Sequence, residues 1–107
     1  MKIIPLRDQI LIEKIYPDDA RYPREFSSDN IVVTFGTEDR ALRDCFFAEV
    51  IAVGEGTECC NETVSLRHTP GDVVIVEQKA ARHAIEPADG PTYFLISDYD
   101  ILARVEL

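Results

Sequence analysis

The sequence predicts a small all-β domain. Five short segments, rich in Ile, Val and aromatic residues, are bounded by turn-forming residues and span 9–15, 48–54, 72–78, 92–97 and 101–107. Clusters of Gly, Pro, Asp and Ser lie between them, as at Pro70-Gly71-Asp72, where such residues favour tight turns. Short strands at this spacing are typical of a small barrel or sandwich.

The last of these segments shows the period of a strand most clearly, because its residues alternate between two faces. One face carries Ile101, Ala103, Val105 and Leu107, and the other carries Leu102, Arg104 and Glu106. We expect the first face to meet the core and the second to be available to a neighbouring subunit.

Length and composition indicate a single domain over residues 1–107. A chain of 107 residues can bury a modest core without disulfides or a structural metal. With 46% hydrophobic and 29% charged residues, it contains no apolar run near the roughly 20 residues that a membrane-spanning helix needs. The apolar stretch in the opening MKIIPLRD is too short for the hydrophobic region of a secretory signal. We therefore expect a cytoplasmic protein with no membrane partner.

The charges argue against nucleic acid as a partner. The formal net charge is −9, from 20 acidic and 11 basic residues, and the basic residues are scattered along the chain. Such a chain would repel a phosphate backbone.

The cysteines indicate a reducing compartment rather than a disulfide framework, since their number is odd. Cys45, Cys59 and Cys60 could be combined with His68 and His83 as metal ligands, but no CxxC or HxxxH spacing holds them together. We expect no metal site, although a thiol or metal protein built on the three cysteines remains an alternative.

Two segments show helical spacing within the predicted all-β chain. In 38–46, Ala41, Leu42, Cys45 and Phe46 recur at helical intervals, and KAARHAIE shows a similar pattern over 79–86 before Pro87. Both are shorter than an isolated helix needs. We treat them as loops with local helical tendency.

The connection between Ile15 and Cys45 is long for so small a domain, and loops of this length are usually functional or disordered. Ile31, Val32 and Val33 stand inside it among polar residues. Local β-propensity favours an ordinary short strand, whereas the polar, proline-interrupted surroundings favour a hydrophobic sequence held out for a partner.

The usual catalytic motifs are missing from the sequence. Gly54-x-Gly56 lacks the third glycine of a dinucleotide fingerprint, because Cys59 stands in its place. We find no GxSxG, HExxH or P-loop, and we expect His68 and His83 to be solvated surface residues. The sequence therefore predicts no catalytic residue and no enzyme.

The order of several short motifs resembles the GroES-type co-chaperonins of the chaperonin-10 family. These motifs are MKIIPLRDQILIEK, IVVTFG inside a polar loop, AEVIAVGEG, PGDVVIVE and SDYDILARVEL, in that order over nearly the whole chain. Each motif alone is weak, and five in register are specific.

The resemblance implies a GroES-like β-barrel that assembles into a heptameric ring and caps a GroEL-type chaperonin, with an unfolded client protein inside the chamber. ATP would be bound by the chaperonin, and this chain would need no cofactor. A mobile loop at about 16–45 would dock through Ile31, Val32, Val33 and Thr34, and a hairpin at about 56–66 would form the roof. The subunit interface would use Lys2, Ile3, Ile4, Pro5 and Leu6 together with Leu102, Ala103, Arg104, Val105 and Glu106.

The chain also departs from the family pattern. The loop is longer on both sides of the tripeptide, and the roof hairpin has Asn61-Glu62 where a glycine is expected. Long loops of this kind resemble those of virus-encoded co-chaperonins, which would place the protein in a host cytoplasm. A GroES-like oligomeric adaptor that does not act with a chaperonin, its tripeptide folded into the sheet, remains an alternative. The client, the source of the chaperonin and the effect of the long loop on the chamber stay open.

Overall fold

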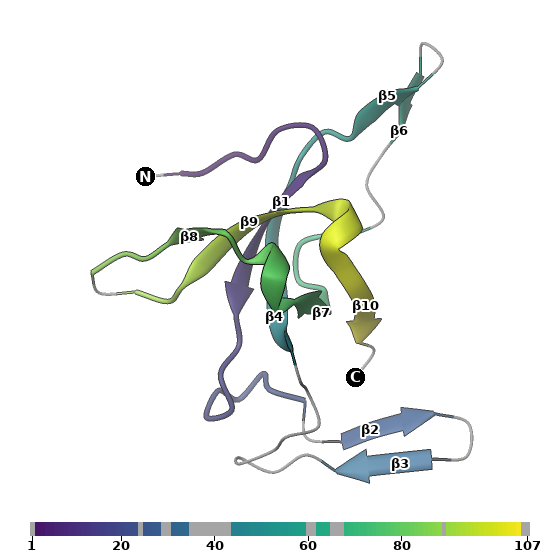
Figure 1. Cartoon of the computed structure of the whole chain (residues 1–107), viewed down its shortest axis with the longest axis vertical. Helices are drawn as coiled ribbons and strands as arrows, with labels where there is room; N and C mark the ends of the chain where they lie inside the picture. The colour runs from purple at the N-terminus through teal and green to yellow at the C-terminus, as the bar shows by residue number, and fades with distance from the viewer. Residues whose placement is uncertain are drawn as a thin grey trace.

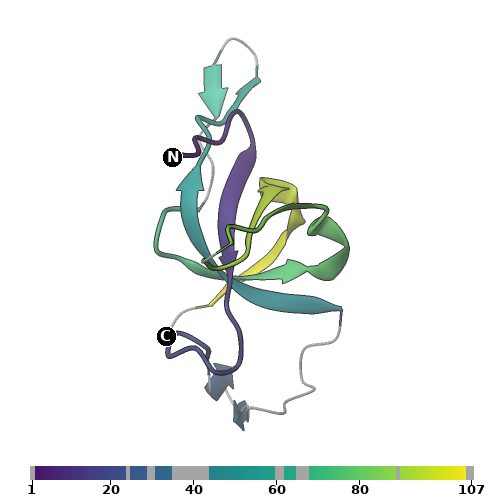
Figure 2. The ribbon, with the colours of Figure 1, turned by 90° about the vertical axis from the view of Figure 1, so that its left-hand side faces the viewer.

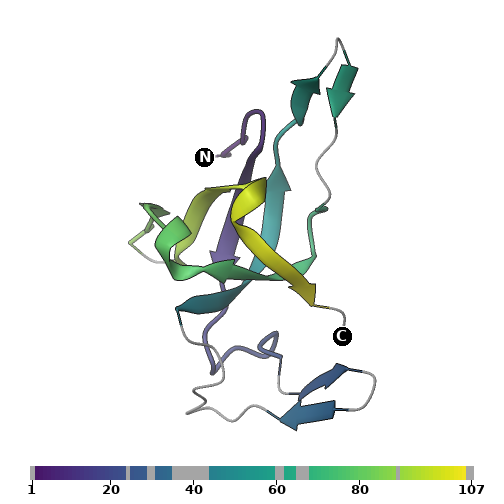
Figure 3. The ribbon, with the colours of Figure 1, turned by 45° about the vertical axis from the view of Figure 1, so that its right-hand side comes forward.

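The computed structural model describes residues 2–23, 25–28, 31–34, 44–59, 62–64, 68–88 and 90–105. It confirms the predicted all-β fold: six antiparallel strands form one sheet that curls into a small barrel (Figures 1 and 3). Their order is β10-β7-β4-β1-β9-β8. The strands are β1 (Gln9–Lys14), β4 (Cys45–Val53), β7 (Val73–Glu77), β8 (His83–Ile85), β9 (Tyr93–Ser97) and β10 (Ile101–Val105).

All five predicted strands are present, with shifts of a few residues at their ends. β4 begins at Cys45 instead of residue 48, so Cys45 and Phe46 are extended and not helical, while residues 38–43 lie outside the described residues. The 79–86 segment contains part of a short 3₁₀ turn, η1 (Gln78–Ala80), followed by β8. β8 was not predicted, since its sequence has helical spacing, and pairing with β9 determines its conformation.

The barrel core consists of aliphatic and aromatic side chains from the central strands. Branched residues fit the pleated surface of such strands. One buried cluster contains Ile10, Ile12, Phe46, Ala48, Val50, Val74, Val76, Phe94 and Ile96. A smaller cluster of Ile15, Phe47 and Val73 lies beside it, with Tyr22 packed against it. This second cluster positions the chain that leaves β1.

Two hairpins project from opposite ends of the barrel, as Figures 1 and 2 show. One consists of β5 (Thr57–Cys59) and β6 (Glu62–Val64), and the other of β2 (Glu25–Ser28) and β3 (Ile31–Thr34). Each forms a separate two-stranded sheet. The first lies within the range expected for the roof hairpin, and Glu62, expected at its tip, pairs with Cys59 as a strand residue.

Candidate functional site

The tripeptide Ile31-Val32-Val33 lies in strand β3, together with Thr34. β3 pairs only with β2 among the described strands, in a register that sets Phe26 opposite Val33 and Ser28 opposite Ile31. The tripeptide therefore forms a strand, as its β-propensity predicts, but in a two-stranded ribbon outside the barrel sheet. We call β2 and β3 the ribbon. An isolated two-stranded ribbon has little stability of its own in water.

Residues 16–23, which precede the ribbon, form a compact turn on the barrel. The amide of Asp19 donates to the carbonyl of Tyr16 at 2.9 Å, and the amide of Tyr22 donates to the carbonyl of Asp19 at 3.0 Å. The Tyr22 ring meets the Phe47 ring edge-on, with 5.0 Å between centroids, and Pro23 is buried. We call residues 16–23 the anchor turn.

Arg21 is the polar centre of the anchor turn. Its Nε and Nη2 donate to the two oxygens of Asp19 at 3.0 and 2.8 Å, and Nη2 also donates to Glu13 Oε2 at 2.5 Å. Nη1 lies 3.4 Å from Glu49 Oε1. Hydrogen bonds from the Arg21 side chain lower the pKa of Asp19 to about 2, and the same contacts, with those to Glu13, raise the pKa of Arg21.

After the ribbon, the described chain resumes at Asp44, directly before β4. Asp44 has a left-handed backbone (φ 59°), and its carbonyl accepts from the amide of Gln78 at 2.7 Å. Burial, with a smaller effect of the Asp44 charge, raises the pKa of the adjacent Cys45 thiol. A protonated thiol is a poor nucleophile. The side chain of Cys59 and the whole of Cys60 lie outside the described residues.

The N-terminal segment, residues 2–8, is held against the turn after β4. The amides of Gly54 and Gly56 donate to the carbonyls of Gln9 and Arg7 at 2.9 and 3.0 Å. A Cβ on Gly54 would lie 2.3 Å from the carbonyl oxygen of Arg7, so only glycine allows this approach. The Val53-Gly54-x-Gly56 motif thus fixes the path of the N-terminal segment.

The two ends of the domain also meet at Asp8. The Ser97 hydroxyl donates to Asp8 Oδ2 at 2.8 Å, and the Asp98 amide donates to the Asp8 carbonyl at 2.9 Å. Hydrogen bonds from Ser97 and then Gln9 lower the pKa of Asp8. Ser97 also caps the 3₁₀ turn η2 (Asp98–Asp100) that leads into β10.

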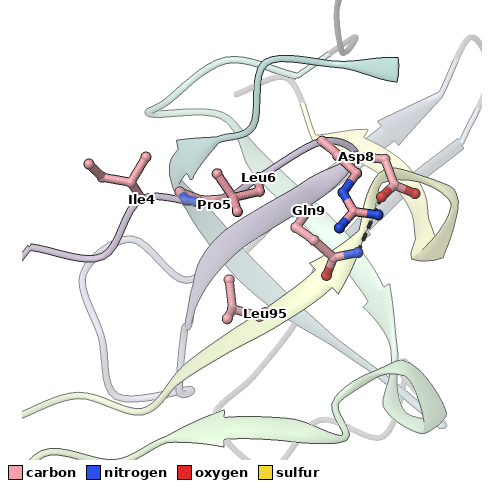
Figure 4. A pocket seen from close by; sticks show the side chains of 7 residues that line it. Ile4, Pro5, Leu6, Asp8, Gln9 and Leu95 are labelled. Carbon is pink, nitrogen blue, oxygen red and sulfur yellow. Dashed lines mark hydrogen bonds between the residues drawn. The ribbon is translucent and has the colours of Figure 1, made fainter. Parts of the chain in front are cut away.

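Beyond this junction the N-terminal segment leaves apolar side chains in solvent. Ile4 is 67% and Leu6 60% exposed, and both line a groove of about 460 Å³ that extends to Leu95 (Figure 4). Residues 2–6 form no strand within this chain. Lys2 is exposed, Ile3 is half-buried and Pro5 is buried.

β10 is an edge strand of the six-stranded sheet, since among the described strands it pairs with β7 alone. Leu102 is 59% exposed on it, Ala103 and Arg104 are exposed, Val105 is half-buried, and Glu106 lies outside the described residues. In Figures 1 and 3 the N-terminal segment and β10 lie on opposite sides of the barrel. The residues predicted for the subunit interface thus fall on two separate surfaces.

The histidines differ from one another. His83 is exposed in β8, as expected. His68 is half-buried, and its Nε2 lies 3.4 Å from Asp98 Oδ1, so the prediction of a solvated His68 is wrong. Across the described parts of the chain, no group of three or more His, Cys, Asp and Glu side chains could hold a metal ion. In the same parts no helix is long and apolar enough to span a membrane.

The structure thus combines a small antiparallel barrel with a two-stranded ribbon outside the barrel sheet. The family described as Chaperonin 10 Kd subunit matches residues 2–105. The chain belongs to this family.

Individual relatives agree with the family match. The chain is 34% identical to the Co-chaperonin GroES of Glaesserella parasuis serovar 5 over 107 residues, which cover 99% of this chain and all of the relative. It is 35% identical to the Co-chaperonin GroES of Actinobacillus succinogenes over the same coverage. A Streptococcus sanguinis Co-chaperonin GroES is 46% identical over 61 residues, which are 55% of this chain and 62% of the relative. The predicted family resemblance is confirmed.

Sequence reasoning missed the Arg21 contacts. Asp19-x-Arg21 is visible as a charged pair within a turn, but Glu13 and Glu49 come from two different strands. Only the register of β1 against β4, which places these glutamates opposite each other, brings them to Arg21.

Proposed function

We propose that this chain is a co-chaperonin that assembles as a ring and caps a GroEL-type chaperonin in an ATP-dependent folding cycle. The observation that carries the proposal is the placement of Ile31, Val32, Val33 and Thr34 in a ribbon outside the barrel sheet. A segment outside that sheet can contact a partner without breaking the strand pairs of the barrel. The chaperonin binds ATP in this scheme, and the chain itself performs no catalysis and takes no cofactor.

The lateral surfaces support head-to-tail assembly. The N-terminal segment offers the exposed Ile4 and Leu6, while β10, the last strand of the sheet, offers the exposed Leu102. Unpaired edges tend to recruit a strand from another chain. Because the two surfaces differ and lie on opposite sides, their contact is heterologous, and heterologous contacts that close give rings. The family implies seven subunits, with the β5–β6 hairpins at the roof.

Ring assembly also makes weak docking effective. Each ribbon contributes a few apolar side chains, worth about 1.5–3 kcal/mol apiece when fully buried, against a cost of several kcal/mol for ordering the segment. Several ribbons on one rigid ring bind together through effective concentration. We place the encounter in the cytoplasm, with an unfolded client enclosed beneath the lid. The net charge of −9 does not suit a nucleic-acid partner.

The alternative of an oligomeric adaptor required the tripeptide to form part of the barrel sheet. β3 pairs with β2 instead, so we retain the chaperonin as the partner. The test is size-exclusion chromatography of the purified chain with a GroEL-type chaperonin, with and without ATP. We expect co-elution only with nucleotide. A ring that never co-elutes, over a series of chaperonins from different sources, would overturn the proposal.

A further inference from the structure

Arg21 fixes the anchor turn, from which the ribbon starts, to the barrel. Neither the family match nor the sequence motifs point to these contacts. Glu13 of β1 and Glu49 of β4 are direct cross-strand partners. Like charges at such positions repel and destabilise the pair. The Arg21 guanidinium reaches both carboxylates, at 2.5 Å to Glu13 and 3.4 Å to Glu49. The β1–β4 strand pair is therefore stabilised when Arg21 stays in place, and Arg21 gains a binding site on the barrel.

The local geometry prepares Arg21 for this contact. Asp19 Oδ1 accepts hydrogen bonds from both the amide and Nε of Arg21, at 2.8 and 3.0 Å. The guanidinium is thus oriented within its own turn, and its planar fork can serve several carboxylate oxygens at once. A lysine, with a single ammonium group, could not reproduce this set of contacts. We call the contacts of Arg21 with Asp19, Glu13 and Glu49 the clamp.

The clamp determines where the barrel ends and the ribbon begins. Pro23 is buried and Tyr22 packs on Phe47, while β2 starts at Glu25. Only residue 24 separates the anchor turn from the ribbon. Without the clamp, the anchor turn would be held less firmly, by contacts such as that of Tyr22 with Phe47. When the turn opens, residues 16–23 join the tether of the ribbon, which then starts at Ile15, the buried residue that follows β1.

We propose that Arg21, through Glu13 and Glu49, is a positioning residue for chaperonin docking, because it keeps the tether of the ribbon short. This inference rests on the proposed docking function. A released anchor turn adds residues that must be ordered again on binding, and a longer tether lowers the effective concentration of the ribbon at its site. This loss of binding free energy is repeated in every subunit of the ring.

The test uses the intact ring and a variant that removes the clamp without leaving two facing charges. The clamp variant combines Glu13→Gln, Arg21→Met and Glu49→Gln. A control with the same change in net charge combines Glu55→Gln, Arg82→Met and Glu86→Gln at exposed positions. Two quantities are measured for each ring: hydrogen exchange of the Tyr22 amide, and affinity for the ATP-loaded chaperonin.

We expect faster Tyr22 exchange and chaperonin binding at least about tenfold weaker in the clamp variant, with the control unchanged in both. Equal affinity despite faster exchange would overturn the inference, and so would unchanged exchange. If the clamp variant fails to form a ring, Arg21→Lys is measured instead, and it must show the same two changes in smaller degree. Absence of binding by the unmodified ring would reject the proposed function, not the role of the clamp.

Discussion

The hydroxyl of Ser97 donates a hydrogen bond of 2.8 Å to the carboxylate of Asp8, 89 positions away in the chain. This contact joins the motif before β1 to the motif before β10. The same hydroxyl accepts from the Tyr99 amide, and the Ser97 amide donates to Asp100. One small side chain thus connects the N-terminal segment with the turn that directs β10.

Replacing Ser97 with alanine should therefore lower the stability of the domain. The loss of an N-cap and of a hydrogen bond to a charged group typically costs about 1–2 kcal/mol. We expect a decrease of that size in the free energy of unfolding, measured by urea denaturation. Ser97→Thr keeps the hydroxyl and should stay close to the unmodified protein. Equal stability of the alanine and threonine variants would show that the contact contributes nothing.

A methyl group at Gly54 should disturb ring assembly more than the barrel. Its Cβ would lie 2.3 Å from the Arg7 carbonyl oxygen, so the N-terminal segment would have to move. Because that segment carries one of the two proposed subunit contacts, Gly54→Ala should sediment as smaller species at concentrations where the unmodified chain forms a ring. Its far-ultraviolet circular dichroism should be preserved.

The matched control for this experiment is Gly90→Ala. The nearest atom to a Cβ there is Pro87 Cβ at 3.4 Å, an ordinary contact. This variant should still assemble. A monomeric unmodified chain at micromolar concentration, insensitive to dilution, would contradict ring assembly itself.

The sequence was sufficient for the barrel strands because each one carries its own signal. Ile10 and Ile12, or Val74 and Val76, combine branched side chains with burial on one sheet, and both preferences act locally. The strand conformation of β8 depends on its pairing with β9. A segment of three residues, His83–Ile85, is too short for its hydrophobic period to predict such a pairing.

The sequence predicted the ribbon only in part, for the same reason. The β-propensity of Ile31-Val32-Val33 predicts a strand, and β3 is one, but the sequence does not say which strand it pairs with. The contacts of Arg21 could not be predicted from the sequence, since they depend on the register that sets Glu13 opposite Glu49. Contacts of high sequence separation follow from the assembled fold, and they include both the clamp and the junction at Asp8.

Acid should weaken the anchor turn over a defined pH range. The pKa of Asp19 is lowered to about 2 by the Arg21 side chain, against about 3.9 for an unfolded aspartate. Its contribution to stability is therefore complete above the unfolded value and is lost as the pH falls toward 2. The stability difference between the unmodified protein and Asp19→Asn should shrink between pH 4 and pH 2. A constant difference over this range would exclude the ionised Asp19 as its source.

The cysteines should be dispensable for assembly. Cys45 is a partly buried thiol in β4 with a raised pKa, and the spacing of Cys59 and Cys60 suits neither a disulfide nor a tetrahedral metal ion. Serine at positions 59 and 60 should leave ring formation and chaperonin binding unchanged. Stoichiometric zinc in the purified protein, lost together with the fold in this variant, would restore the metal hypothesis.

The tripeptide should serve docking and not folding. Ile31→Ser combined with Val33→Ser changes two residues of the ribbon, whose strands are not part of the barrel sheet, so the melting temperature of the free ring should barely move. Binding to the ATP-loaded chaperonin should collapse more steeply than for one site, because every subunit carries the same lesion.

Ile12→Val provides the opposite control. Ile12 is fully buried in the barrel, and the lost methylene should cost about 1 kcal/mol of stability while the folded ring still binds the chaperonin normally. If instead the ribbon variant melts several degrees lower and still caps the chaperonin, then β3 is a structural strand. The docking residues would then have to be sought on another surface of the ring.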